Sequence, residues 1–127
     1  MFTVGSSGGA CVLPGSLEAD PLVLVEGLFD ALSLAAAGLP SVATIGRWVD
    51  WLPSRIGRRE VWLAFDGNHP GDRWAREWAA QLSDARTFRL RPPGGRGDWN
   101  AAARRIGTSD LERWIRRDAR KQLEVLR

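Results

Sequence analysis

Acidic side chains follow three apolar segments of this chain, at the points where buried strands would end. Glu26 comes directly after LVLV, Asp66 comes directly after VWLAF, and Asp98 lies in the loop after TFRL. Asp30 stands four residues beyond Glu26, a spacing that brings two side chains together on one helix face. Carboxylates bind hard divalent cations, and Mg²⁺ takes carboxylates, water and substrate phosphates as ligands. The four acids are therefore candidate ligands of a magnesium site.

The placement of these acids depends on a parallel sheet. Ligands of open α/β sheets bind at the carboxyl ends of the strands, so Glu26, Asp66 and Asp98 are expected at one edge. Acids gathered there repel one another unless a cation is bound or their pKa values rise. Each residue also has an ordinary alternative role in a turn or a helix cap. Their shared position after strands favours the metal site.

Alternating strand and helix patterns supply the sheet that the site requires. Apolar runs predict strands at 22–25, 41–45, 60–65 and 85–90. Helical patterns predict helices at 28–37, 47–56, 70–83 and 110–126. The second of these is interrupted at Pro53, a further short helix opens at Asp98 or Asn100, and a capping box of Ser109 and Glu112 opens the last. This order predicts an α/β fold with a mostly parallel four-stranded sheet and helices on both faces, preceded by a short β-hairpin at 1–14.

Length and composition fit one ordinary domain. The 127 residues are enough for a single core. Charged residues interrupt every apolar run before it could span a bilayer, and the N-terminus lacks the features of a secretory signal. Cys11 is the only cysteine, which excludes an internal disulfide, and one Cys with one His excludes a structural zinc site. These features predict a cytoplasmic protein without a membrane partner.

Basic residues and tryptophans supply candidate contacts to nucleic acid. Arginine provides all but one of the 18 basic residues, and they concentrate toward the C-terminus although the net charge is only +3. That distribution favours a polyanionic partner, while a solvated helix face explains the same charges. Trp99 either contacts substrate or wedges its loop onto the core, and His69 fits a solvent-facing loop. The candidates for contacts to phosphates and bases are Arg89, Arg91, Arg96, Trp99, Arg104 and Arg105.

Three segments together resemble the toprim domain, which primases, topoisomerases and some nucleases share. They are LVLVEGLFDALSLAAAGLPSVATIG, VWLAFDGNHPGDRWA and PPGGRGDWN, and the resemblance covers about residues 20–106. The likeness is greatest to primase-type toprims, in which a strand ends in Asp-Gly-Asp and a loop with an aspartate leads into the last helix. The resemblance implies a Rossmann-like toprim core at 20–106 within a single domain 1–127. The hairpin 1–14 and a basic C-terminal helix, 108–127, flank this core.

The resemblance also implies a role for each acid. Glu26 matches a glutamate assigned general acid or base chemistry, and Asp66 matches the first acid of an Asp-x-Asp pair, which is catalytic and binds Mg²⁺. Asp30 and Asp98 match acids that line the same site. Asn68 falls where the second aspartate of the pair is expected. An amide oxygen can ligate Mg²⁺, or Mn²⁺ in its place, but it brings no negative charge, so a two-metal site would be weakened there.

The expected function is Mg²⁺-dependent chemistry on nucleic-acid phosphodiesters, with primase-like nucleotidyl transfer in DNA replication as the first hypothesis. The resemblance implies DNA or RNA and nucleotides as substrates, and other primase or helicase domains or subunits as partners. A small toprim nuclease is one alternative. A non-catalytic module that binds nucleic acid or a partner is another, and Asn68 favours it. The chain has no tyrosine, so it cannot alone perform the tyrosine-dependent cleavage of topoisomerases.

Overall fold

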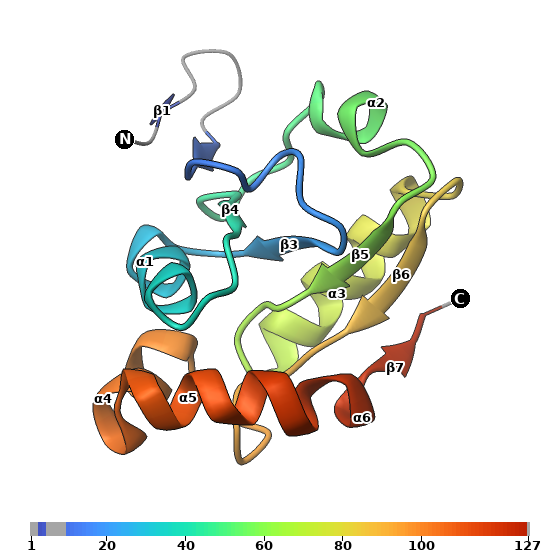
Figure 1. The fold of residues 1–127 in the computed structure, drawn as a ribbon. Coiled ribbons are helices and arrows are strands. Elements are labelled where there is room, and N and C mark those ends of the chain that lie inside the picture. The colour runs from blue at the N-terminus through green and yellow to red at the C-terminus, as the bar shows by residue number, and fades with distance from the viewer. Residues whose placement is uncertain (1–2, 5–9, 127) are drawn as a thin grey trace.

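The fold is an α/β sandwich around one mixed sheet. A computed structural model describes residues 3–4 and 10–126, and seven strands in this part of the chain pair in the order β1-β2-β4-β3-β5-β6-β7 (Figure 1). The four central strands run parallel to one another. Their bounds are Leu22–Val25 for β3, Val42–Ala43 for β4, Glu60–Leu63 for β5 and Arg86–Arg89 for β6.

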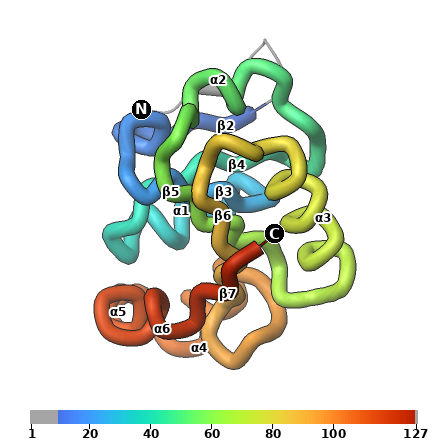
Figure 2. The backbone as a smooth tube through the Cα atoms, turned by 90° about the vertical axis from the view of Figure 1, so that its right-hand side faces the viewer, coloured from blue at the N-terminus to red at the C-terminus, as the bar shows by residue number. Residues whose placement is uncertain are grey.

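Helices cover both faces of this sheet. Alternate side chains of β3 point to opposite sides: Val23 and Val25 pack with α1, α4 and α5, whereas Leu22 and Leu24 pack with α2 and α3. Figure 2 shows α1 and α3 on opposite sides of the central strands. No helix among the described residues is both long enough and apolar enough to cross a bilayer. The helices are α1 Leu28–Ala36, α2 Leu52–Ile56, α3 His69–Gln81, α4 Trp99–Ile106, α5 Thr108–Trp114, a π-helix at Ile115–Ala119, and α6 Arg120–Gln122.

The predicted α/β fold with a parallel four-stranded core is confirmed, and its topology creates a crevice at one edge. From β3 the chain passes through α1 to β4 on one side, and from β5 it passes through α3 to β6 on the other. The direction of winding therefore reverses between β3 and β5, which is the position where open α/β sheets bind ligands. Glu26 and Asp66 follow these two strands, so the fold brings both to the switch point.

Short strands extend the sheet at both of its ends. At one end, β1 (Thr3–Val4) pairs antiparallel with β2 (Cys11–Val12), which pairs antiparallel with β4. The predicted hairpin 1–14 is confirmed for these strands, while its turn lies outside the described residues. At the other end, β7 (Glu124–Val125) pairs antiparallel with β6, a strand that the sequence did not predict.

Several predicted boundaries were wrong for local reasons. Strand β3 has the predicted bounds, whereas β4, β5 and β6 are shorter than predicted, although the backbone beyond β5 still pairs with β3 through the Ala64 N–H. Pro53 does not interrupt a helix but lies in the first turn of α2, where no amide donor is needed. The last helical segment begins at Thr108, after Gly107 and without a side-chain cap, so the Ser109 capping box is also wrong. Helical structure ends at Gln122 because the chain then extends into β7.

Candidate metal centre at the carboxyl edge of the sheet

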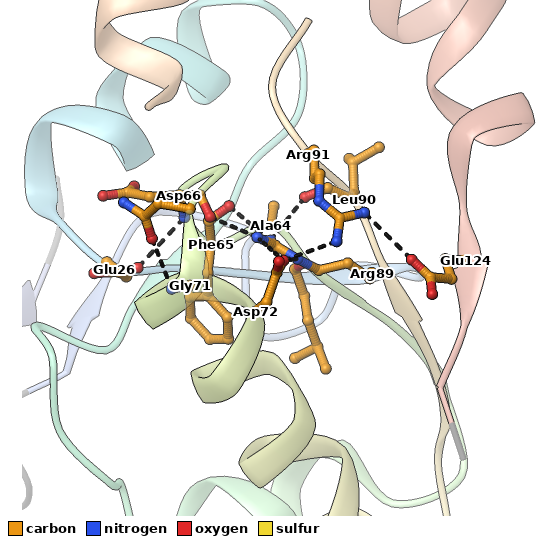
Figure 3. Close-up of polar contacts among 12 residues, drawn as sticks. Glu26, Ala64, Phe65, Asp66, Gly71, Asp72, Arg89, Leu90, Arg91 and Glu124 are labelled. Carbon is orange, nitrogen blue, oxygen red and sulfur yellow. Dashed lines mark hydrogen bonds and ion pairs between the residues drawn. The ribbon is translucent and has the colours of Figure 1, made fainter. Parts of the chain in front are cut away.

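Glu26 and Asp66 lie next to each other at the switch point. The backbone N–H of Asp66 donates a hydrogen bond to Oε1 of Glu26 at 3.3 Å (Figure 3). The carboxylate oxygen Oδ1 of Asp66 is buried and has no hydrogen-bond partner among the described residues. A buried oxygen without a partner is unfavourable by about 1–3 kcal/mol unless a bound group satisfies it. The pair therefore fits the donor set of a hard cation.

Asp30 and Asp98 lie at the beginning of α4 and help to form it. Asp98 is the N-cap residue of this helix, and its Oδ1 accepts a hydrogen bond from the Ala101 N–H at 2.6 Å. Asp30 is buried in α1, and its Oδ1 accepts from the Asn100 N–H at 3.0 Å. Both carboxylates thus satisfy amides at a helix N-terminus, where negative charge is stabilised. The ordinary capping role and a place beside the candidate metal site therefore coincide in these two residues.

Electrostatic effects show that the four acids share one region. Burial, followed by the charges of Glu26, Asp30 and Asp98, raises the pKa of Asp66 to about 7, and the positive charge of Arg89 opposes this rise. Burial also raises the pKa of Asp30; a backbone hydrogen bond to its carboxylate opposes the rise, and the charges of Asp98 and Glu26 add to it. The sheet edge therefore holds excess negative charge that a cation would relieve.

The donor set fits a magnesium ion that keeps much of its water. Within residues 3–4 and 10–126, no three His, Cys, Asp or Glu side chains stand close enough to form a ready-made metal cage. Mg²⁺ is usually held by one or two carboxylates, with waters and substrate phosphates as its other ligands. Glu26 and Asp66 suit direct ligation, while Asp30 and Asp98 add negative charge around them.

Asn68 has a structural role that the sequence analysis did not identify. It is the N-cap residue of α3, and its Oδ1 accepts a hydrogen bond from the Gly71 N–H at 2.7 Å. A Cβ at Gly71 would collide with the backbone carbonyl of Asp66. Helix α3 therefore begins directly against the edge of the sheet that holds Glu26, Asp30, Asp66 and Asp98, here called the acid edge. His69 is exposed in the first turn, as expected. An Asn followed by Pro70 at the start of a helical pattern is a signal that could have revealed this cap.

Arg89 is a structural residue, and the expectation that it binds phosphate was wrong. Its side chain is only 1% exposed and forms an ion pair with Asp72 at 2.9 Å (Figure 3). The charge and hydrogen bonds of Arg89, joined by Arg91, lower the pKa of Asp72 although burial acts in the opposite direction. The guanidinium also donates to four backbone carbonyls, those of Leu63, Phe65, Asp66 and Leu90. Arg89 thereby fixes the backbone that leads from β5 to the acid edge.

Trp99 is also a core residue rather than a surface contact. Its side chain is fully buried, and its indole N–H donates a hydrogen bond to the carbonyl oxygen of Ala64 at 2.8 Å. The ring lies against Trp114, with centroids 5.8 Å apart. The expected substrate contact is therefore wrong, and the alternative that Trp99 wedges its loop onto the core describes its position.

The other predicted basic residues lie around the acid edge and on α4. Arg91 is 33% exposed and bonded to Asp72 and Glu124. Arg96 is exposed in the loop before α4. Its backbone lies close to Gly67, because a Cβ added at Gly67 would be only 2.5 Å from the Cα of Arg96. Arg104 and Arg105 are exposed in the last turn of α4. These four residues remain predictions as nucleic-acid contacts.

The carboxylates at the switch point of the parallel sheet are the feature by which this domain can be compared with known families. The sequence matches the Toprim-like family over residues 23–103, most of the chain, and the chain belongs to that family. A comparison with curated proteins found no match.

Two solved structures share the fold. One contains the zinc-binding and RNA polymerase domains of the Aquifex aeolicus primase, with a TM-score of 0.69 and 21% identity over 96% of this chain and 31% of that one. The other is the RNA polymerase domain of Mycobacterium tuberculosis primase DnaG, with a TM-score of 0.55 and 23% identity over 75% of this chain and 35% of that one. The chain thus spans about a third of each of these structures. At these identities the likeness shows that the chain shares the fold of these domains.

Proposed function

We propose that this chain is a Mg²⁺-binding toprim module that acts on nucleic-acid phosphodiesters, with primase-like nucleotidyl transfer as its reaction. The main support for the proposal is the environment of the Asp66 carboxylate. Its Oδ1 is buried without a partner among the described residues, and burial together with three neighbouring acids raises its pKa to about 7. Such an environment destabilises the ionised carboxylate of Asp66 in the metal-free protein, and a bound cation would stabilise it.

The acidic side chains would have different roles in the proposed reaction. Asp66 and Glu26 would hold the ion, which supplies stabilisation of the charge that develops on the reacting phosphate. One oxygen of Glu26 accepts the Asp66 N–H, so this hydrogen bond orients the carboxylate toward the site. The other oxygen of Glu26 would then ligate the ion. Asp30 and Asp98 keep the local potential negative and hold α4 against α1.

One observation favours a weaker, single-metal variant of this function. The Oδ1 atom of Asn68 is engaged by the Gly71 N–H, and the side chain is neutral. A second ion therefore lacks a carboxylate at this position, which supports the binding module as the second candidate. In that case the domain would bind one cation and a nucleic acid without catalysing a reaction.

Two measurements test the proposal. Isothermal titration with Mg²⁺ and Mn²⁺ should show binding to the wild type that Asp66→Asn removes, while Arg76→Ala, an exposed change on α3, leaves it intact. Incubation with labelled nucleic acid, and separately with template and nucleoside triphosphates, distinguishes shortening from extension. Extension that requires Glu26 supports primase-like transfer, and shortening supports the nuclease. Cation binding without either product supports the binding module, and the absence of cation binding refutes the proposal.

A further inference from the structure

A groove beside α3 begins at the acid edge. Its first part is a hollow of about 180 Å³ lined by Glu26, Gly46, Pro70, Arg73 and Trp74. Its second part is a hollow of about 420 Å³ lined by Trp48, Trp74, Glu77, Ala80 and Gln81. Trp74 lines both hollows, and Gly46 and Trp48 are separated by a single residue. The two hollows therefore adjoin at Trp74, and together they are here called the α3 groove, which extends from Glu26 along α3.

Two half-buried tryptophans form rigid walls of the α3 groove. The ring of Trp48 packs on Trp78 with centroids 4.2 Å apart, and Trp74 meets the same ring edge-on at 6.3 Å. Because Trp78 is fully buried, it anchors both groove residues in place. Aromatic faces held in this way are platforms on which unpaired bases stack.

The backbone opposite α3 is fixed to the acid edge. Ile45 adopts a left-handed conformation with φ of 57°, which β-branched residues rarely do. Its N–H donates a hydrogen bond to the carbonyl oxygen of Glu26 at 2.7 Å. The following residue, Gly46, lines the first hollow. The wall of the groove and the carboxylate of the site are thus tied to the same short stretch of backbone.

One exposed arginine lines the α3 groove, and a second lies next to it in the sequence of the loop. Arg73 lines the hollow next to Glu26, and Arg47 lies between the two groove residues of its loop. No ion pair or side-chain hydrogen bond within the described chain engages either guanidinium, so both are available to phosphates. The carboxylates of Glu26 and Glu77 also line the hollows and repel phosphates, so Arg73 is the lining residue that attracts a backbone phosphate.

We propose that the α3 groove binds a single-stranded polynucleotide, with a backbone phosphate on Arg73 and bases stacked on Trp74 and Trp48. This inference rests on the proposed function, because the groove would lead the strand to the cation site at Glu26. A duplex does not fit this description, since its bases are stacked on one another and leave no face for the tryptophans. The acid edge supplies the chemistry, and the groove supplies the path of the strand.

Fluorescence anisotropy with fluorescein-labelled oligo(dT) and oligo(U) tests the role of Arg73. Arg73→Ala should weaken binding roughly five-fold and reduce the slope of log affinity against log salt by about 0.7, the value for one phosphate of a single strand. Arg76→Ala is the matched control, because Arg76 is exposed on the same helix and lines neither hollow. Equal effects of the two changes, or no binding of either oligonucleotide to the wild type, overturn the proposal. The two oligonucleotides separately report DNA and RNA binding.

Photocrosslinking of the unaltered protein to a strand that carries 5-iodouracil tests the tryptophans without a risk of misfolding. Crosslinked peptides should contain Trp48 or Trp74, and crosslinks confined to the arginine-rich segment 104–121 overturn the proposal. Cation titrations keep the two proposals separate. Intact cation binding with no effect of Arg73→Ala rejects the groove alone, and absent cation binding with a clear effect of Arg73→Ala rejects the metal site alone.

Discussion

Replacing Asp66 by Asn should stabilise the metal-free protein at neutral pH. The pKa of Asp66 is about 7 in the folded chain against 3.8 as the ordinary value, because burial and the charges of Glu26, Asp30 and Asp98 disfavour ionisation. The folded state therefore holds a proton that the unfolded chain has released. Since the folded state binds more protons between these two values, stability falls as pH rises from about 4 to about 7 and is constant above.

The size of this effect follows from the shift. About three units at 1.36 kcal/mol per unit set an upper limit of roughly 4 kcal/mol, and we expect about 2–4 kcal/mol for the partly buried carboxylate. Asp66→Asn keeps the shape of the protonated acid and cannot ionise. It should therefore match the wild type below pH 4 and exceed its free energy of unfolding by this amount at pH 8.

Urea unfolding in EDTA across pH 4–8 measures the difference directly. Asp84→Asn removes one exposed carboxylate between α3 and β6 and serves as the control. Parallel stability profiles for the wild type and Asp66→Asn across this range would refute the reasoning, because they would mean that Asp66 ionises as freely in the folded protein as in the unfolded chain. Adding Mg²⁺ should then raise the stability of the wild type and leave that of Asp66→Asn unchanged.

Substitutions at three other residues test the surroundings of the site. Asn68→Asp should preserve the cap of α3 and tighten Mn²⁺ binding in calorimetry, whereas Asn68→Ala should lower stability by about 1 kcal/mol; unchanged affinity in Asn68→Asp would exclude this position from the metal site. Arg89→Lys should lower the free energy of unfolding by roughly 3 kcal/mol, since lysine cannot reach the carbonyls that the buried guanidinium satisfies; a loss within 0.5 kcal/mol, the range usual for surface changes, would contradict its structural role. Trp99→Phe should cost about 1–2 kcal/mol in thermal unfolding, because the Ala64 carbonyl oxygen loses its donor; an unchanged midpoint would argue against that hydrogen bond.

The parallel core was predictable because its signals are local. The run LVLV is fully apolar, as a strand buried on both faces must be, and Gly38 and Pro40 mark the end of the helix that follows. The four acids could be assigned to one edge because chain order and the winding rule for parallel strands fix which ends of the strands face together.

The parts that sequence reasoning missed depend on contacts between distant segments. The two-residue strand β7 exists because it pairs with β6, and nothing within Glu124–Val125 distinguishes it from a helix end. Arg89 was predicted to contact phosphate, as an arginine near the site, and only the fold brings Asp72 and the carbonyls after β5 around it. Its position in a predicted strand was visible in the sequence, but its partners were not.

Anomalous diffraction from a crystal soaked with Mn²⁺ would locate the cation. We expect a peak within about 2.0–2.3 Å of a carboxylate oxygen of Asp66, with Glu26 as the second protein ligand and water molecules as the remaining ligands. A well-ordered crystal in which Mn²⁺ binds elsewhere and leaves these two carboxylates without a peak would contradict it.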